Sequence, residues 1–337
     1  MINLNEVITD ASILLKRYTI RDGFPFTTIT HPGNVYDAIV IKYPQNVQCS
    51  VYTALTGSNR SLEEQIDFIN ENKIEKALII AENIDFISKC PTLKHIQIIP
   101  ADTAGNDFDY SPLYKLSNIK SLDCHTEYGP LENLSTAIDY SGFSNLESVS
   151  LSCFGHKNFN TLKTLKSIGV SGYKEHDLTD LFSSSILDTL MMIQCSNKSL
   201  KGIEKSKKVQ CLYLYYNRSL RDITALREVR KTLKALRIEC CPRIEDFSVL
   251  GGLENLELLE LTGGNSLPDL SFLKKMKNLK TFIFNMNVLD GDLSPCLNLS
   301  YVYSEKNRKH YNLKDSQLPK KQYFRGNEDI EEWRRME

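Results

Sequence analysis

The sequence lacks the short motifs that usually mark an enzyme or a metal site. It contains no glycine-rich phosphate-binding loop, no His-Glu-x-x-His pair and no Cys-x-x-Cys pair. The adjacent pair Cys124-His125 is the sharpest suggestion of a nucleophile beside a base. We therefore expect no catalytic residues, no bound cofactor, no metal and no small-molecule substrate.

Long apolar runs and an excess of one charge are also missing. No stretch approaches the roughly 18 uncharged apolar residues that a membrane span requires. The formal net charge is −1 over 337 residues, whereas proteins that bind nucleic acid or membrane surfaces in bulk usually carry a basic excess. The N-terminal residues lack a basic start followed by an apolar run, so no signal peptide is expected.

The cysteine content does not indicate a disulfide framework. The nine cysteines are an odd number and are spread along the chain. With 41% hydrophobic and 25% charged residues, the chain is long enough to form a large core without such cross-links. These features favour a cytoplasmic protein in a reducing compartment.

What the sequence does contain is a repeat. The pattern apolar-x-x-apolar-x-apolar returns at intervals of 19 to 27 residues, and it starts at Ile74, Leu93, Ile119, Leu146, Leu165, Leu187, Val209, Leu233, Leu256, Leu279 and Leu299. A recurring period of this length is typical of a solenoid, in which each repeat packs only on its neighbours. We expect positions 1, 4 and 6 of each copy to point into the core.

The clearest copies resemble leucine-rich repeats. Residues 209–217 and 279–287 both have the form L-x-x-L-x-L-x-x-N, and the copies starting at 187 and 233 carry Cys at the ninth position. The half-repeats 219–226 and 266–273 are similar to the short repeats of internalin-like proteins. The resemblance implies an α/β fold, a leucine-rich-repeat solenoid whose curved parallel β-sheet forms the concave face.

Repeat register also decides how the suggestive residues lie. Asn217, at position 9, is expected to turn inward and bind backbone groups. Cys124 occupies position 6 and faces the core, whereas His125 at position 7 faces outward, so the two side chains point to opposite sides of a strand. They cannot form a catalytic pair.

The two ends are expected to be non-repeat caps. We divide the chain into an N-terminal α/β cap (1–73), a solenoid of about eleven repeats (74–308) and a C-terminal cap (309–337). Short strands are predicted at 36–43 and 47–52, and Ser61-Leu-Glu-Glu opens a helix with a capping-box signature. A short terminal helix containing Trp333 is predicted after residue 326.

Positions 3, 5 and 7 alternate with the core positions and should line the concave sheet. In the central repeats these positions carry large side chains with polar ends, a composition common at protein-binding hot spots. The candidate partner-binding residues are Met191, Ile193, Tyr213, Tyr215, Arg237, Glu239, Glu260 and Tyr303. Ordinary sheet preferences for Tyr and Ile offer an alternative explanation of the same residues.

Charge is segregated along the chain. Residues 198–237 contain twelve Lys or Arg against three acids, and residues 239–269 contain seven acids against Arg243. Pairing between neighbouring repeats is one explanation, and steering of a charged partner is another. Nucleic-acid binding by the basic stretch is a further alternative, and it would show a steep dependence on salt.

These observations together predict a non-enzymatic module that presents a rigid concave surface to a protein partner. Compact solenoids of this kind often act as adaptors or inhibitors, and some bacterial ones are immunity proteins that neutralise a cognate toxin. The resemblance therefore implies one of these roles. An enzyme with its catalytic unit in residues 1–73, where His31 is the main candidate, is the alternative from another class.

Overall fold

The computed structural model describes residues 38–44, 61–104, 108–124, 138–152, 156–321 and 323. The chain forms two compact units, Met1–Leu165 and Lys166–Glu337. Within each unit, strands alternate with short helical turns, nearly all of them 3-10 helices.

In the first unit the elements are β1 (Ala38–Tyr43), α2 (Leu62–Glu71), β2 (Lys76–Ala81), η1 (Asp85–Lys89), β3 (His95–Pro100), η2 (Ser111–Lys115), β4 (Ser121–Asp123), η4 (Tyr140–Gly142), β5 (Ser148–Ser152) and η5 (Phe159–Thr161). The strands pair in parallel and in sequence order. The helix α2 begins with the predicted capping box, in which Ser61 Oγ accepts from Glu64 N at 3.2 Å.

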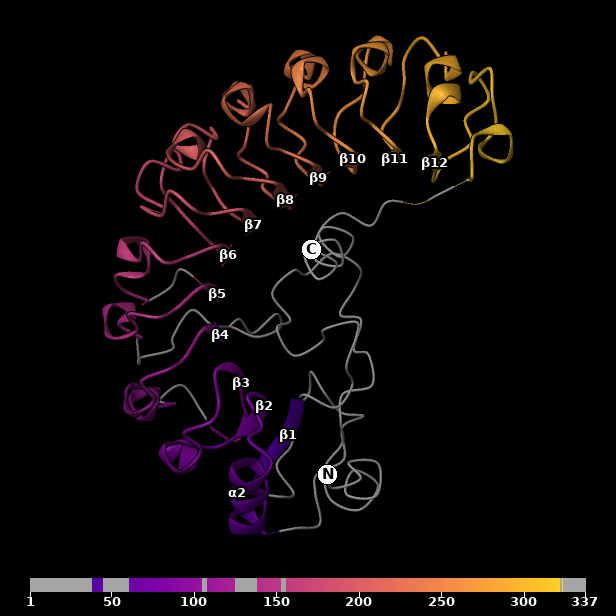
Figure 1. The fold of residues 1–337 in the computed structure, drawn as a ribbon. Helices are drawn as coiled ribbons and strands as arrows, with labels where there is room; N and C mark the ends of the chain where they lie inside the picture. The colour runs from indigo at the N-terminus through magenta and orange to yellow at the C-terminus, as the bar shows by residue number, and fades with distance from the viewer. Residues whose placement is uncertain are drawn as a thin grey trace. The chain divides into compact units, whose positions relative to one another are not determined.

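In the second unit they are β6 (Ser167–Ser171), β7 (Thr189–Ile193), η6 (Ile203–Lys205), β8 (Cys211–Tyr215), η7 (Thr224–Val229), β9 (Ala235–Glu239), η8 (Ser248–Gly252), β10 (Leu258–Thr262), η9 (Ser271–Lys275), β11 (Thr281–Phe284), η10 (Ser294–Asn298), β12 (Tyr301–Ser304) and η11 (Asp315–Gln317). All seven strands are parallel neighbours. Figure 1 shows the strands along one side of this unit and the helical turns along the other.

The core lies between these two sides and consists of the predicted positions. Val209, Leu212 and Leu214, at positions 1, 4 and 6 of one repeat, are completely buried. Equivalent residues of neighbouring repeats are in register, as Leu212 is with Leu190 and Leu236. Each repeat therefore completes the core of the next.

The strand β1 is a further copy of the pattern that the sequence analysis did not find. Ile39 and Ile41 are in register with Ala77 and Ile79, which are positions 4 and 6 of the first recognised repeat. The copies are 38 residues apart because the helix α2 lies between them in place of a short 3-10 turn. The expected strand at 47–52 and the terminal helix with Trp333 lie outside the described residues.

One backbone arrangement recurs where the strands begin. The carbonyl of Glu75 accepts hydrogen bonds from both Lys94 N and His95 N, at 2.7 and 2.9 Å. The same double acceptance occurs at nine junctions between described repeats, with N···O distances from 2.7 to 3.1 Å. This shared carbonyl fixes the register of each strand on its neighbour whatever side chain the position carries.

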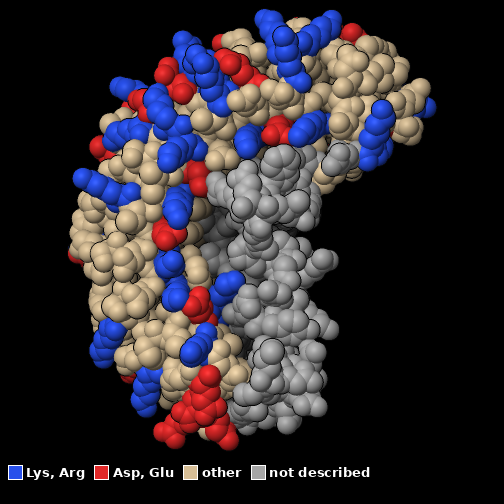
Figure 2. Space-filling view, viewed as in Figure 1, with Lys and Arg blue, Asp and Glu red and all other residues tan. Residues whose placement is uncertain are grey.

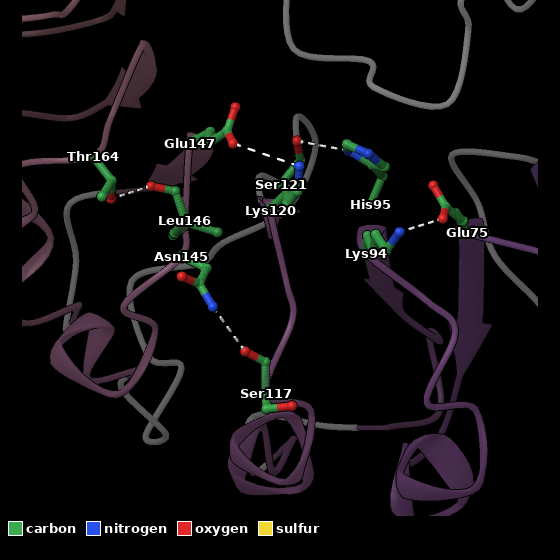
Figure 3. A network of polar contacts seen from close by, with 10 residues as sticks. All are labelled: Glu75, Lys94, His95, Ser117, Lys120, Ser121, Asn145, Leu146, Glu147 and Thr164. Carbon is green, nitrogen blue, oxygen red and sulfur yellow. Dashed lines mark hydrogen bonds and ion pairs between the residues drawn. The ribbon is translucent and has the colours of Figure 1, made fainter.

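Side chains reinforce the beginning of the strands, as Figure 3 shows for the first unit. Lys94 pairs with Glu75, and Lys120 Nζ lies 3.7 Å from Glu147 Oε1. A polar residue before position 1 binds the preceding repeat, as Thr164 Oγ1 does to the carbonyl of Leu146 at 2.6 Å. Neighbouring repeats thus satisfy one another's polar groups at this edge.

The strands end in an equally regular way. The residue at position 8 has a left-handed backbone in five consecutive repeats, and these residues are Gly172, Gln194, Tyr216, Cys240 and Gly263. This turn directs the next side chain inward. The amide of Asn217 is fully buried; its Oδ1 accepts from Cys195 N at 2.7 Å and its Nδ2 donates to Met192 O at 3.1 Å.

Replacing Asn217 is therefore expected to weaken the fold. In Asn217→Ala, the buried N–H of Cys195 and carbonyl of Met192 lose their partner, which costs about 1–3 kcal/mol. Urea unfolding followed by circular dichroism measures the change, with Asn298→Ala, an exposed position, as the control. Equal stability of the two variants would contradict the conclusion that the buried amide of Asn217 stabilises the fold.

A second prediction concerns acid. An Asp begins many of the turns that lead to the 3-10 helices, and its carboxylate accepts from the residue two positions on; Asp222 accepts from Thr224 N at 2.8 Å. Hydrogen bonds from the hydroxyl and N–H of that Ser or Thr lower the pKa of Asp139, Asp177, Asp222, Asp246, Asp269 and Asp292.

Because these folded pKa values lie below the ordinary 3.8, their stabilisation is present above that pH and is lost as the pH falls through the folded values. A variant with Asp222, Asp246 and Asp269 changed to Asn keeps an acceptor but cannot titrate. Its unfolding free energy should fall less steeply between pH 4 and pH 2 than that of the wild type. Identical slopes would show that these carboxylates do not govern acid unfolding.

Candidate functional site

The concave face of the second unit is formed by residues at positions 3, 5 and 7 of its strands. Their exposure increases along each strand, from position 3 to position 7. At position 3, Thr189, Cys211 and Ala235 are all buried. At position 7, Ile193, Tyr215 and Glu239 are half-buried. The side of the sheet where the strands end is therefore its accessible side.

The central row does not have the exposure that alternation alone predicts. Met191, Tyr213 and Arg237, at position 5 of β7, β8 and β9, are only 1%, 2% and 6% exposed. Position 5 opens further along the unit, where Glu260 is half-buried and Tyr303 is 41% exposed. The expectation that the central row is open was wrong. These three candidate residues are buried, and their side chains pack within the protein.

Two of these residues, Tyr213 and Arg237, are joined to each other and to their neighbours by ring and polar contacts. The guanidinium carbon of Arg237 lies 5.6 Å from the ring centroid of Tyr213, and Arg237 Nε lies 3.6 Å from Glu260 Oε2. The ring of Tyr213 is stacked on that of Tyr215, with centroids 6.4 Å apart. A cation over a ring and a nearly buried ion pair hold this group in one arrangement.

Burial also sets the chemistry of the two phenols. It raises the pKa of both Tyr213 and Tyr215, so each hydroxyl stays neutral at physiological pH. Tyr215 is the more accessible of the two, but its hydroxyl oxygen is buried, so the part that it exposes is its ring. Beside it, Ile193 adds an aliphatic surface and Glu239 a carboxylate, in register on adjacent strands.

The described residues provide little evidence for a metal site or for a catalytic nucleophile. No group of three or more His, Cys, Asp or Glu residues there is arranged to hold a metal ion. Burial raises the pKa of the Cys124 thiol, which disfavours the nucleophilic thiolate. His125 and His31 lie outside the described residues. Every helix within the described ranges is too short or too polar to cross a bilayer.

Some basic residues of the stretch 198–237 form ion pairs with acidic residues of neighbouring repeats. Lys207 Nζ lies 3.7 Å from Glu228 Oε2, and Arg230 Nε lies 3.1 Å from Glu254 Oε1. Figure 2 shows the same interspersion of basic and acidic side chains over the face in view. This pairing supports the structural explanation for at least part of the charge segregation.

Comparison with solved structures places the fold. An internalin (inlF) from Listeria monocytogenes superimposes with a TM-score of 0.50 at 17% sequence identity, covering 80% of this chain and 81% of that one. An internalin C2 (inlC2) from the same organism gives 0.36 at 22% identity over 59% and 74% of the two chains. A plant peptide hormone receptor, RGFR1, solved in complex with RGF2, gives 0.31 at 12% identity over 68% and 50%.

The likeness to inlF shows that the chain has the internalin-like leucine-rich-repeat fold, which confirms the fold predicted from the repeat. In sequence, the chain matches no protein-family model and no protein of curated function. The fold is therefore established by structure, and the function is argued from the surface.

The burial of the central row leads to a test of its role. Tyr213→Ala removes a large side chain that is 2% exposed and should destabilise the protein by about 3 kcal/mol. Tyr303→Ala, at the same repeat position but 41% exposed, should cost less than about 1 kcal/mol. Thermal and urea unfolding compare the two. Similar losses would contradict the difference in burial along position 5.

Proposed function

We propose that this chain is a non-enzymatic protein-binding module that holds one protein partner on the concave face of its second unit. The half-buried row formed by Ile193, Tyr215 and Glu239 carries the proposal, because it joins aliphatic, aromatic and charged groups on three adjacent strands. Tyrosine is enriched among binding hot spots, and here the ring of Tyr215 supplies apolar area while its hydroxyl is buried.

The other candidate residues act beside this row. Met191, Tyr213 and Arg237 lie directly alongside and fix the positions of the side chains that the partner contacts. Glu260 and Tyr303 extend the surface toward β12, where position 5 is more accessible. A surface held in one conformation loses little conformational entropy on binding, which favours high affinity.

We further propose that the protein acts in the cytoplasm as an inhibitor or adaptor, with an immunity protein that neutralises a cognate toxin as the sharper form. The cysteines support a reducing compartment. The seven described ones are free thiols, and six of them are buried among apolar side chains, where they pack as small hydrophobic residues. An immunity protein requires one tightly bound partner, which a rigid preformed surface suits.

The decisive experiment compares a variant of the proposed surface with a control variant elsewhere in the same unit. Ile193→Ala/Tyr215→Ala alters the proposed surface, whereas Leu297→Ala removes a side chain of η10 that is 48% exposed. Affinity capture from the native lysate with mass spectrometry identifies the partner, and titration calorimetry measures its affinity.

We expect a one-to-one complex whose affinity falls at least tenfold in the first variant and is unchanged in the second. Unchanged affinity in both would show that the partner binds elsewhere. Growth protection by co-expression with the captured protein would support the immunity role. Several partners of modest affinity would support an adaptor instead.

A further inference from the structure

In the second unit, the loops that follow the strands contain exposed basic residues that form no ion pair with a described residue. Where the strands begin, by contrast, charged residues pair between repeats. We call the loops after β7 to β11 the exit turns, and they cover residues 194–202, 216–223, 240–247, 263–270 and 285–293. The exit turns lie beside the half-buried row at position 7. They therefore border the accessible side of the sheet.

The first two exit turns hold basic residues that are not neutralised. Lys198, Arg218 and Arg221 are exposed, and none of them forms an ion pair with any described residue. On other surfaces of the same unit, basic residues pair across repeats, as Arg230 does with Glu254 and Lys280 with Glu257. The basic residues of the first two exit turns thus keep their positive charge available, as do exposed residues of the stretch 198–237 outside these turns, such as Lys208 and Lys231.

The backbone holds these charges in a fixed arrangement. The carbonyl of Lys198 accepts from both Arg221 N and Asp222 N at 3.0 Å, which places the two basic residues on neighbouring repeats side by side. Gln194, Tyr216 and Cys240 begin the exit turns with φ of 51°, 58° and 53°. Each such residue costs about 1 kcal/mol relative to an ordinary conformation, so the packing around the turns determines their shape.

The next three exit turns have the opposite sign. They contain one basic residue, Arg243, and five acidic ones: Glu245, Asp246, Asp269, Asp290 and Asp292. The first two contain four basic residues against Asp222 alone. Along the direction in which the repeats stack, the exit turns therefore change from positive to negative within five strands.

We propose that the exit turns bind an extended protein segment with the complementary order of charge, acidic against Lys198, Arg218 and Arg221 and basic against the acidic turns. This inference rests on the proposed function and specifies its partner. A polyphosphate chain fits the surface poorly, because it would meet the five acids as soon as it passed the second turn. Complementary charge also fixes the register of such a segment and accelerates its association.

The spacing of the repeats sets the length of the segment. Neighbouring strands are about 4.8 Å apart, so five exit turns extend over roughly 19 Å. An extended chain covers that distance with about six residues. The recognised segment is therefore short, with a block of acidic residues directly followed or preceded by a block of basic ones.

The test uses the full chain and three labelled peptides of identical composition, read by fluorescence anisotropy at low and high salt. Two carry four Glu and four Lys in separate blocks, in either order, and the third alternates them. An oligonucleotide of eight thymidines is the fourth probe. We expect one block peptide to bind at least about tenfold more tightly than the alternating peptide at low salt.

The variant Lys198→Glu/Arg218→Glu/Arg221→Glu should abolish that preference. The matched variant Lys274→Glu/Lys275→Glu/Lys277→Glu, which reverses three exposed charges on and just after η9, should keep it. Equal binding of block and alternating peptides would overturn the proposal. Oligonucleotide binding that the first variant alone removes would also overturn it and would assign the surface to nucleic acid.

The affinity of the variants for the captured natural partner distinguishes a failure of this inference from a failure of the proposed function. If the first charge-reversed variant keeps full affinity for the captured partner while Ile193→Ala/Tyr215→Ala loses it, the concave surface is correct and the exit-turn proposal is wrong. If both variants lose affinity and the variant on η9 does not, both proposals stand. Loss in the charge-reversed variant alone would support the exit turns and refute the concave row.

Discussion

The fold depends on a backbone contact: the carbonyl at position 2 of one repeat accepts two N–H groups from the next. In the described junctions it brings every strand onto its neighbour with the same offset. Because the offset is constant, positions 4 and 6 of successive repeats meet in the core, as Leu190, Leu212 and Leu236 do. At Cys195, Asn217 and Cys241 the inward position-9 side chain then bonds to the backbone of the preceding repeat.

This constant offset also arranges the surface. Residues of one position form a row along the stacking direction, so charges at the beginning of the strands meet partners on the adjacent repeat. Position 7 and the exit turns form rows of their own, in which half-buried aromatic and aliphatic side chains lie beside exposed charges that have no such partners. The region where the strands end therefore brings apolar surface and exposed charge together.

Much of the fold could be predicted from the sequence because the repeat is a property of local spacing. Core positions such as Leu212 and the inward amide of Asn217 follow from the period, and the capping box at Ser61 follows from four residues. The strand at 36–43 was predicted, but β1 was not recognised as a copy of the repeat, because the helix α2 lengthens its interval to 38 residues.

The candidate site was less predictable, because its accessibility is not a local property. Alternation places Tyr213 on the concave side, but its 2% exposure depends on what surrounds it in three dimensions. The left-handed conformation of Tyr216 and Cys240 carries no sequence signal either, since glycine is the residue that usually marks such a turn. Ion pairs between residues more than twenty positions apart, such as Arg230 with Glu254, also require the fold to be known.

The use of a backbone carbonyl to set the register has an evolutionary consequence. A main-chain acceptor is the same for every amino acid, so mutations at the more accessible position 7 leave the register of the scaffold intact as long as the core rows persist. Lineages can therefore diverge in what they recognise, one repeat at a time, while keeping one architecture. The same architecture therefore accommodates sequences as different as this chain and the internalin inlF, which are 17% identical.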